Sequence, residues 1–175
     1  AAGFCSPKGR LLAAFTLWRE GGATLLQLPK ALAEPMRKKL SMYVLRAKVT
    51  LSDVSDARPA LGLAGTQAVA ALQAAGLDVP DQDMAQATTG DVNVLRLAAD
   101  RFEIVLPADR LEALWAALAA HATPSGTAAW RWFDIRDGLA TVWAGTQEEF
   151  VPQMVNFELT GGVNFKKGCY PGQEI

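Results

Sequence analysis

The sequence has no excess of charge of either sign and no long apolar run. Its 17 lysines and arginines are balanced by 18 aspartates and glutamates, which leaves a net charge of −1. A chain without a basic excess offers no overall electrostatic surface for a polyanion, so we expect no direct binding of nucleic acid. The longest apolar stretches, 11–18 and 113–120, are far too short to cross a bilayer. We therefore expect a soluble protein without a membrane partner.

Cysteine and histidine are too scarce for several kinds of site. The two cysteines, Cys5 and Cys169, are far apart and form neither a zinc-type pair nor a disulfide framework. This usage suits a reducing cytosol, so we expect free thiols and a cytoplasmic location. His121 is the single histidine, which argues against a Ser-His-Asp triad or a zinc site. No metal site is predicted.

The chain is long enough to fold, yet its ends are unusual. Its 175 residues, half of them apolar, suffice to bury a core without a disulfide or metal staple. There is no initiator methionine, and Ile175 follows a motif without a terminating turn. We expect the chain to be a fragment of a longer protein.

Apolar spacing in the first third predicts a hairpin and a helix. Two apolar runs, 11–18 and 23–28, lie on either side of Gly21-Gly22 and predict a β-hairpin. The next segment has apolar residues at helical spacing, with Pro35 forcing a kink or a fresh helix start. Residues 48–54 alternate like a strand.

The middle of the chain predicts a β-α-β-β-α order. The elements are strand 60–63, helix 66–75, strand 92–98, strand 102–106 and helix 109–121. This order fits half of a ferredoxin-like layer, and the fold class is therefore α+β. The last helix starts with Asp109 and Glu112 in the spacing of a capping box, and it is predicted to bury Leu111, Leu114, Trp115 and Leu118.

The segment 123–126, Thr-Pro-Ser-Gly, is the best internal boundary because its proline and glycine end a helix and permit a turn. It divides the chain into residues 1–123, with the hairpin and the α+β part, and residues 124–175, with the Lys-Gly-Cys-Tyr-Pro-Gly-Gln-Glu loop. From Trp130 onward the periodicity fades and glycines are spread through loops, which tend to carry function.

The segment with the clearest candidate for a reactive group contains two lysines close to one cysteine. Lys166 and Lys167 precede Cys169, and nearby positive charge favours the reactive thiolate. Gly168 and Gly172 let the backbone bend around the thiol. The alternative is that Cys169 is a small buried hydrophobe and the lysines form a solvated edge.

The string Phe165–Glu174 resembles the signature of the YgfZ family, a branch of the folate-binding T-protein superfamily. The match runs from Lys167 to Glu174 without a gap. The likeness is strong over about the last 45 residues, where further similar positions precede the motif: Phe150–Gln153, Asn156, Gly161-Gly162 and Phe165. Cys5–Arg10 resembles the early turn of the family.

This resemblance implies a T-protein-like folate-binding fold, related to the aminomethyltransferase of the glycine cleavage system. It implies tetrahydrofolate as the cofactor and a role in the assembly or repair of iron–sulfur enzymes, some of which modify tRNA. Iron–sulfur client or assembly proteins are the expected partners. On this analogy Cys169 is the functional thiol, and Lys167 lowers its pKa or contacts an anionic group. Tyr170, Gln173 and Glu174 shape the loop, and with Trp130 and Asn156 they are the expected folate-binding residues.

Two further positions bear on the kind of chemistry. Trp130 could stack on a pterin or benzoyl ring, or else Trp130 or Trp132 simply fills the core. Arg136 stands where the aminomethyltransferase relatives usually have a glutamate, and a guanidinium can only donate hydrogen bonds. The alternatives to an accessory factor are a folate-dependent aminomethyltransferase-like enzyme of one-carbon transfer, which Arg136 disfavours, and a binding module without chemistry at Cys169.

Overall fold

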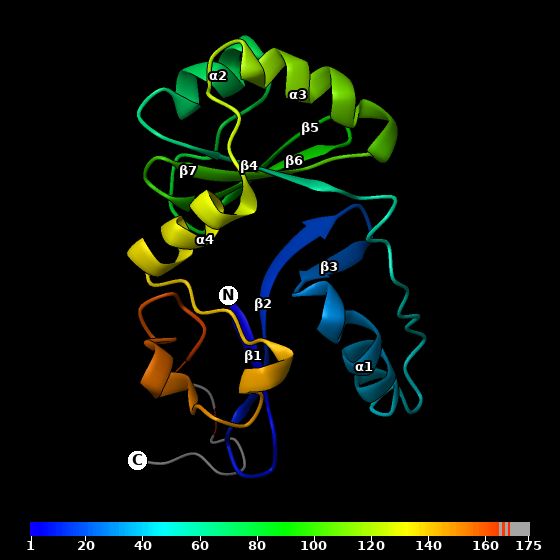
Figure 1. Ribbon diagram of the computed structural model, residues 1–175. Coiled ribbons are helices and arrows are strands. Elements are labelled where there is room, and N and C mark those ends of the chain that lie inside the picture. Colours follow the sequence, from blue (N-terminus) through cyan, green and yellow to red (C-terminus); the bar gives the residue numbers. More distant parts are fainter. Residues whose placement is uncertain (165, 167, 169–175) are drawn as a thin grey trace. The chain divides into compact units, whose positions relative to one another are not determined.

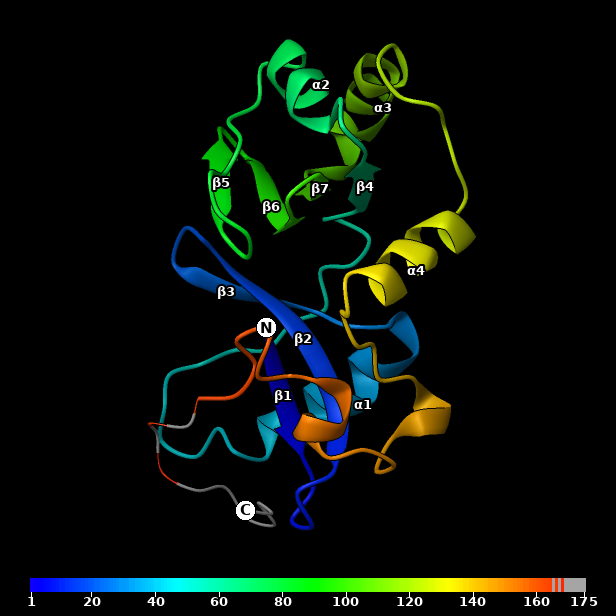
Figure 2. The same cartoon turned by 90° about the vertical axis from the view of Figure 1, so that its left-hand side faces the viewer.

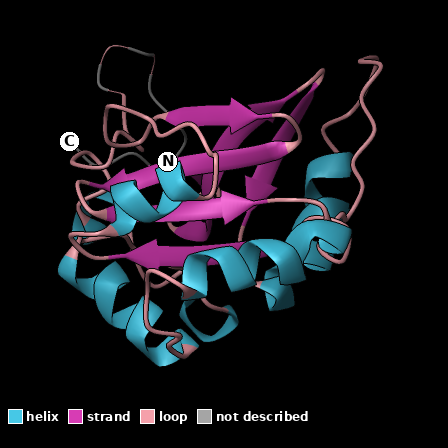
Figure 3. Cartoon of the chain, turned by 90° about the horizontal axis from the view of Figure 1, so that it is seen from above, coloured by secondary structure: helices cyan, strands magenta, loops and turns pink. Residues whose placement is uncertain are grey.

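The computed structural model describes residues 1–164, 166 and 168, and the chain divides into two compact units. The terminal unit combines residues 1–53 with 134–175, and the central unit is formed by residues 54–133. Helices and antiparallel sheets occur together (Figure 3), which confirms the α+β class. The T-protein-like fold stays a prediction. The boundary expected at 123/124 lies inside the central unit, and the division into 1–123 and 124–175 also stays a prediction.

A three-stranded antiparallel sheet forms the framework of the terminal unit (Figure 2). Its strands, in the order β1-β2-β3, are β1 (Ala2–Cys5), β2 (Leu11–Glu20) and β3 (Ala23–Gln27). Glu20 pairs with Ala23 across Gly21-Gly22, and Gly21 has a φ of +55°, which glycine adopts without a steric penalty. The predicted hairpin is confirmed.

Helix α1 (Lys30–Ser41) packs its apolar side against this sheet. Leu32 and Met36 share a buried cluster with Ala13 and Phe15 of β2. The helix runs through Pro35 without interruption, so the predicted fresh start is wrong. Residues 48–54, which were expected to form a strand, have no regular secondary structure. Most of their side chains are exposed, and no described strand pairs with them to provide the hydrogen bonds of a ladder.

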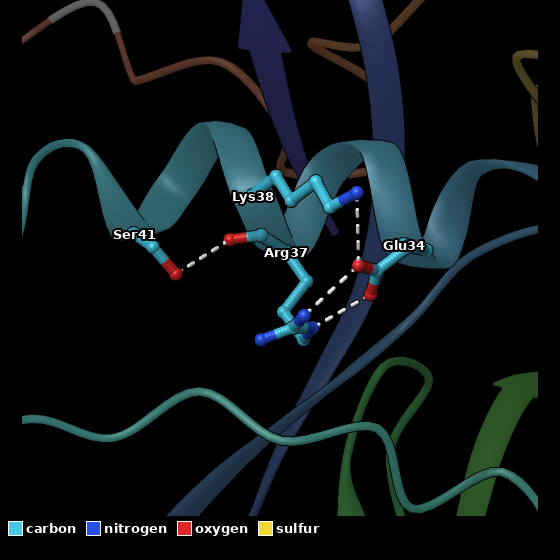
Figure 4. Close-up of polar contacts among 4 residues, drawn as sticks. All are labelled: Glu34, Arg37, Lys38 and Ser41. Carbon is cyan, nitrogen blue, oxygen red and sulfur yellow. Dashed lines mark hydrogen bonds and ion pairs between the residues drawn. The ribbon is translucent and has the colours of Figure 1, made fainter.

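The other side of α1 carries a small network of charged groups (Figure 4). The carboxylate of Glu34 accepts hydrogen bonds from Nε of Arg37 at 2.7 Å and from Nη2 at 2.9 Å, and Nζ of Lys38 lies 3.4 Å away. The hydrogen bonds from Arg37 hold the pKa of Glu34 below its ordinary value. Because these groups are in contact with solvent, they contribute little to stability.

A four-stranded antiparallel sheet forms the framework of the central unit. Its order is β4-β7-β6-β5, with β4 (Ala60–Ala64), β5 (Gln86–Thr89), β6 (Val92–Ala98) and β7 (Arg101–Val105). The sequence predicted β4, β6 and β7 but not β5. In a split β-α-β unit a third strand lies between the two parallel strands and is antiparallel to both, and here β7 lies in this way between β4 and β6. The order of the three predicted strands agrees with the ferredoxin-like layer, and the unpredicted β5 adds an edge hairpin with β6.

Helices α2 (Ala68–Ala74) and α3 (Leu111–Ala119) cover one face of this sheet (Figure 1). The core between them is built from alternate strand residues and the inner sides of the helices, including Leu63, Leu72, Val94, Phe102, Ile104 and Leu118. The strand side chains that do not enter this core point to the opposite face, since direction alternates along a strand.

The N-terminus of α3 and the set of side chains that the helix buries differ in part from the sequence prediction. A short 3₁₀ turn (Ala108–Arg110) precedes the helix, and neither element has a side-chain cap, so the capping box at Asp109 is wrong. Leu118 is buried and both Leu111 and Leu114 pack against the core, as expected. Trp115 was predicted to be buried with them, but 45% of it is exposed.

The segment after helix α4 (Thr127–Arg136) contains two short 3₁₀ helices, η2 (Ala144–Thr146) and η3 (Pro152–Val155). It is tied to the start of β2 by backbone hydrogen bonds: N–H of Leu11 donates to the carbonyl of Phe150 at 2.7 Å, and N–H of Glu148 donates to the carbonyl of Leu11 at 2.9 Å. Residues from the two ends of the sequence thus form one unit.

Candidate functional site

Trp130, the predicted stacking residue, lies on α4 against the face of the four-stranded sheet that α2 and α3 leave uncovered (Figure 1). Its indole is partly buried and sits directly on Gly62 of β4. A Cβ atom at position 62 would lie 2.4 Å from Cε3 of the indole, closer than any real contact. Glycine is therefore the residue that leaves room for this ring, a common reason for glycine inside a strand.

The guanidinium of Arg101 completes the contact from the sheet side. Its Cζ atom is 4.0 Å from the centroid of the Trp130 ring, which is the geometry of a cation–π interaction. Arg101 has no exposed surface, and in the β4–β7 pairing it lies opposite Ala64, while Glu103 lies opposite Gly62. We call Gly62, Arg101, Glu103 and Trp130 the Trp130 cluster.

The same face of the sheet carries a second set of polar side chains, on β5 and β6. Asn93 is fully buried, and its Oδ1 accepts hydrogen bonds from Nε2 of Gln86 at 2.8 Å and from Oγ1 of Thr88 at 2.9 Å. Glu103 on the neighbouring strand is 7% exposed. This face therefore differs from the apolar helical face, because it presents both hydrogen-bond donors and acceptors.

Trp132 and Arg136, also on α4, do not join the cluster. Trp132 is 58% exposed, with its ring edge-on to that of Phe133 at 5.1 Å between centroids, so the interpretation that it fills the core is wrong. Arg136, in the last turn of α4, donates a hydrogen bond from Nε to Oδ1 of Asp137 at 2.7 Å. Position 136 therefore carries a hydrogen-bond donor, and not the carboxylate acceptor of the aminomethyltransferase relatives.

Asn156 belongs to the terminal unit, whereas Trp130 belongs to the central unit. It ends η3 in the left-handed region, with a φ of +54°, and it is exposed. Its backbone N–H donates to the carbonyl of Gln153 at 3.2 Å, and its own carbonyl accepts from N–H of Leu159 at 3.0 Å. Asparagine adopts this conformation more readily than most residues, so Asn156 has a local role in the turn.

Of the two glycines before the motif, Gly162 packs against Phe157, and Gly161 allows a left-handed backbone. The ring of Phe157 is buried, and a Cβ atom on Gly162 would lie 2.3 Å from its Cδ1, while one on Gly3 would lie 3.1 Å from its Cε1. N–H of Gly162 also donates to the carbonyl of Phe157 at 2.8 Å. Gly161 has a φ of +72°, which suits glycine. The stretch before the motif is thereby fixed to β1.

The remaining predicted residues, Lys167, Cys169, Tyr170, Gln173 and Glu174, lie outside the described residues. The other thiol, Cys5, is on β1, and partial burial raises its pKa, which disfavours the thiolate. Across residues 1–164, 166 and 168, no group of histidine, cysteine and acidic side chains could hold a metal ion. Nor does that part of the chain contain a helix of sufficient length and apolarity to span a membrane.

Arg101 and Gly62 were not singled out from the sequence, although weak indications were present. A glycine inside a predicted strand, 60–63, can mark a close approach of another group. Arg101 and Glu103 alternate with the apolar Phe102 and Ile104, which puts both charges on the second face of a strand. Neither indication identifies Trp130 as the partner.

Comparison with known proteins identifies relatives of the chain. No protein-family model matches the chain. The chain is 31% identical over 173 residues to the tRNA-modifying protein YgfZ of Cronobacter sakazakii, an alignment that covers 98% of this chain and 52% of that protein. It is also 31% identical over 176 residues to the tRNA-modifying proteins YgfZ of Escherichia coli O127:H6 and Shigella boydii serotype 4, covering 99% of this chain and 54% of each. The chain spans about half the length of the curated relatives it matches, and over nearly all of its own length it is similar to proteins of the YgfZ family.

Proposed function

We propose that this chain binds tetrahydrofolate at the Trp130 cluster, as part of an accessory protein that supports the assembly or repair of iron–sulfur clusters, including those of tRNA-modifying enzymes. The name of the relatives connects those proteins with tRNA modification. The folate and iron–sulfur parts of the proposal come from the family resemblance, and the Trp130 cluster is the feature of the fold that supports the folate part.

The observation that carries the proposal is the anchoring of Trp130 from one side. Gly62 and Arg101 both contact the indole from the sheet, and the ring is only partly buried. A flat ring held in this way offers its other side to a pterin or benzoyl ring, a contact of about 0.5–1.5 kcal/mol beyond the burial of area.

We assign the chemistry to Cys169, with Lys167 as the neighbour that stabilises its thiolate. The two cysteines of the chain differ in their tendency to form a thiolate. Burial raises the pKa of Cys5, which disfavours its thiolate. Lys166 and Lys167 bring positive charge close to Cys169 in the sequence, which favours its thiolate. One cysteine cannot hold an iron–sulfur cluster alone, since such clusters usually have four thiolate ligands. Further ligands would have to come from a client or assembly protein, or from a second copy of the protein.

The transferase alternative receives no support from the described residues. A carboxylate that accepts from the N–H groups of the pterin is replaced by Arg136, whose guanidinium donates to Asp137. The accessory role is accordingly the function that we propose, and aminomethyl transfer is not proposed as a second one.

Two experiments test the two parts of the proposal. Calorimetric titration of the full-length protein with tetrahydrofolate should give saturable binding. A titration without any heat of binding would contradict the proposal that the protein binds folate. In cells that lack the protein, wild-type full-length protein should restore the activity of an iron–sulfur tRNA-modifying enzyme, whereas Cys169→Ala should not. Cys5→Ala is the matched control and should restore it. Full rescue by Cys169→Ala would show that the thiol of Cys169 is not required for the function.

A further inference from the structure

Arg101 contacts the indole of Trp130 from within the sheet, with its Cζ atom 4.0 Å from the ring centroid. We infer that Arg101 is a positioning residue, which fixes the indole of Trp130 on the sheet in the orientation needed for stacking against a ligand ring. This inference rests on the proposed function, because the ligand ring is that of tetrahydrofolate. Arg101 has no exposed surface, so it acts on the indole and not on the solvent side where the ligand arrives.

The energetics of burial support a specific role for this cation. Taking an arginine side chain fully out of water is costly unless its charge is compensated by good partners. The ring of Trp130, with Cζ of Arg101 at 4.0 Å from its centroid, is such a partner, since the negative face of an indole attracts a cation, and more so away from water. The same attraction acts on the indole and restricts its rotation.

Small residues on the neighbouring strand β4 leave room for the indole ring of Trp130. On the face of β4 that Trp130 covers, the residues are Ala60, Gly62 and Ala64, all of which are small. Gly62 lies opposite Glu103 and Ala64 lies opposite Arg101 in the register of β4 and β7. The indole therefore lies against Gly62 in this row of small residues, with the guanidinium of Arg101 over its ring. A larger residue at position 62 would displace the ring, because even a methyl group would lie 2.4 Å from Cε3.

The orientation of Trp130 can be measured without any ligand. The chain has five tryptophans, so protein labelled with 5-fluorotryptophan should give five ¹⁹F resonances, and Trp130→Phe identifies the one from Trp130. Arg101→Met removes the cation while keeping an apolar side chain of similar length. We expect the Trp130 resonance to shift or broaden in Arg101→Met while the other four stay in place. An unchanged Trp130 resonance would overturn the inference.

If Arg101→Met does not fold, Arg101→Lys replaces it. A compact ammonium cannot lie flat on the ring as the planar guanidinium does, so the Trp130 resonance should again shift. An unshifted resonance in a folded Arg101→Lys protein would contradict the positioning role.

Titration with tetrahydrofolate then separates the inference from the proposed function. We expect Arg101→Met and Gly62→Ala to weaken binding by about 2- to 12-fold, the factor that corresponds to one ring-stacking contact. Gly126→Ala is the matched control, because a Cβ atom there meets nothing within 4 Å, and it should bind as the wild type does. Binding by wild type and equal binding by Arg101→Met would reject the inference and leave the proposed function standing. No binding by wild type would reject the proposed function itself, and the stacking role with it.

Discussion

The contact between Phe157 and Gly162 allows a quantitative test of how the stretch before the motif is held. We predict that Gly162→Ala destabilises the terminal unit, because the new methyl carbon would lie 2.3 Å from Cδ1 and 2.7 Å from Cε1 of Phe157. The ring cannot easily move away, since Phe157 is 3% exposed and the same ring edge also lies close to Gly3, at 3.1 Å from Cε1 to a Cβ atom placed there. Tight packing of this kind transmits the strain to the backbone.

The size of the effect follows from the cost of overpacking a core. An inserted methyl group that forces neighbours to shift costs about 1–3 kcal/mol. For a chain of this length, that corresponds to a fall of about 2–12 °C in the midpoint of thermal unfolding. Gly145→Ala is the matched control, because a Cβ atom at that position has no neighbour within 4 Å, and its midpoint should match that of the wild type.

Thermal unfolding followed by circular dichroism measures these midpoints, and a double variant tests the cause. Phe157→Leu removes ring atoms and should relieve the overlap, so the double variant should be more stable than the sum of the two single changes predicts, by about 0.5–3 kcal/mol. A Gly162→Ala protein as stable as Gly145→Ala would refute the packing role of Gly162. Strict additivity in the double variant would show that Phe157 is not the group that the methyl meets.

Three further predictions concern single groups. In a Cys169→Ala background at pH 8, Cys5 should be alkylated more slowly than a free thiol, because burial raises its pKa; equal rates would contradict this. The Glu34 carboxyl has its pKa lowered from 4.5 by Arg37, so its stabilising effect is present above pH 4.5 and lost as pH falls through the lowered value. Urea unfolding of wild type and Glu34→Gln should therefore differ slightly at pH 7 and not at pH 2, and a difference that persists at pH 2 would contradict the ion-pair origin of the effect. Asn156→Ala should cost about 1 kcal/mol in urea unfolding, and Asn156→Gly should cost less, because of the left-handed backbone at that position.

Local sequence patterns predicted the elements whose own residues determine them. The Gly21-Gly22 turn and its flanking apolar runs were sufficient for the hairpin, and the limits of β6 were predicted at Val92 and Ala98. Strand β5 was missed because Gln-Ala-Thr-Thr has no apolar alternation, and its pairing with β6 creates it. The capping box at Asp109 failed because a 3₁₀ turn precedes α3 there.

The candidate site depended on contacts between distant parts of the sequence. Trp130 was singled out by family resemblance, and the sequence did not connect it with Gly62 or Arg101, which are 68 and 29 positions away. Such contacts depend on which strands are neighbours and on their register, and in the observed order β4-β7-β6-β5 the strand β4 lies next to β7. Because β4 pairs with β7, Gly62 and Arg101 reach the same ring.

The measurement that tests the central claim most directly is a tetrahydrofolate titration of the full-length protein followed by tryptophan fluorescence. Wild type should show saturable quenching, and Trp130→Phe should lose most of it. Trp132→Phe is the matched control on the same helix, because Trp132 is 58% exposed and lies outside the Trp130 cluster, so its titration should keep the affinity of the wild type. Saturable quenching of equal size and affinity in Trp130→Phe would contradict the assignment of the folate site to Trp130.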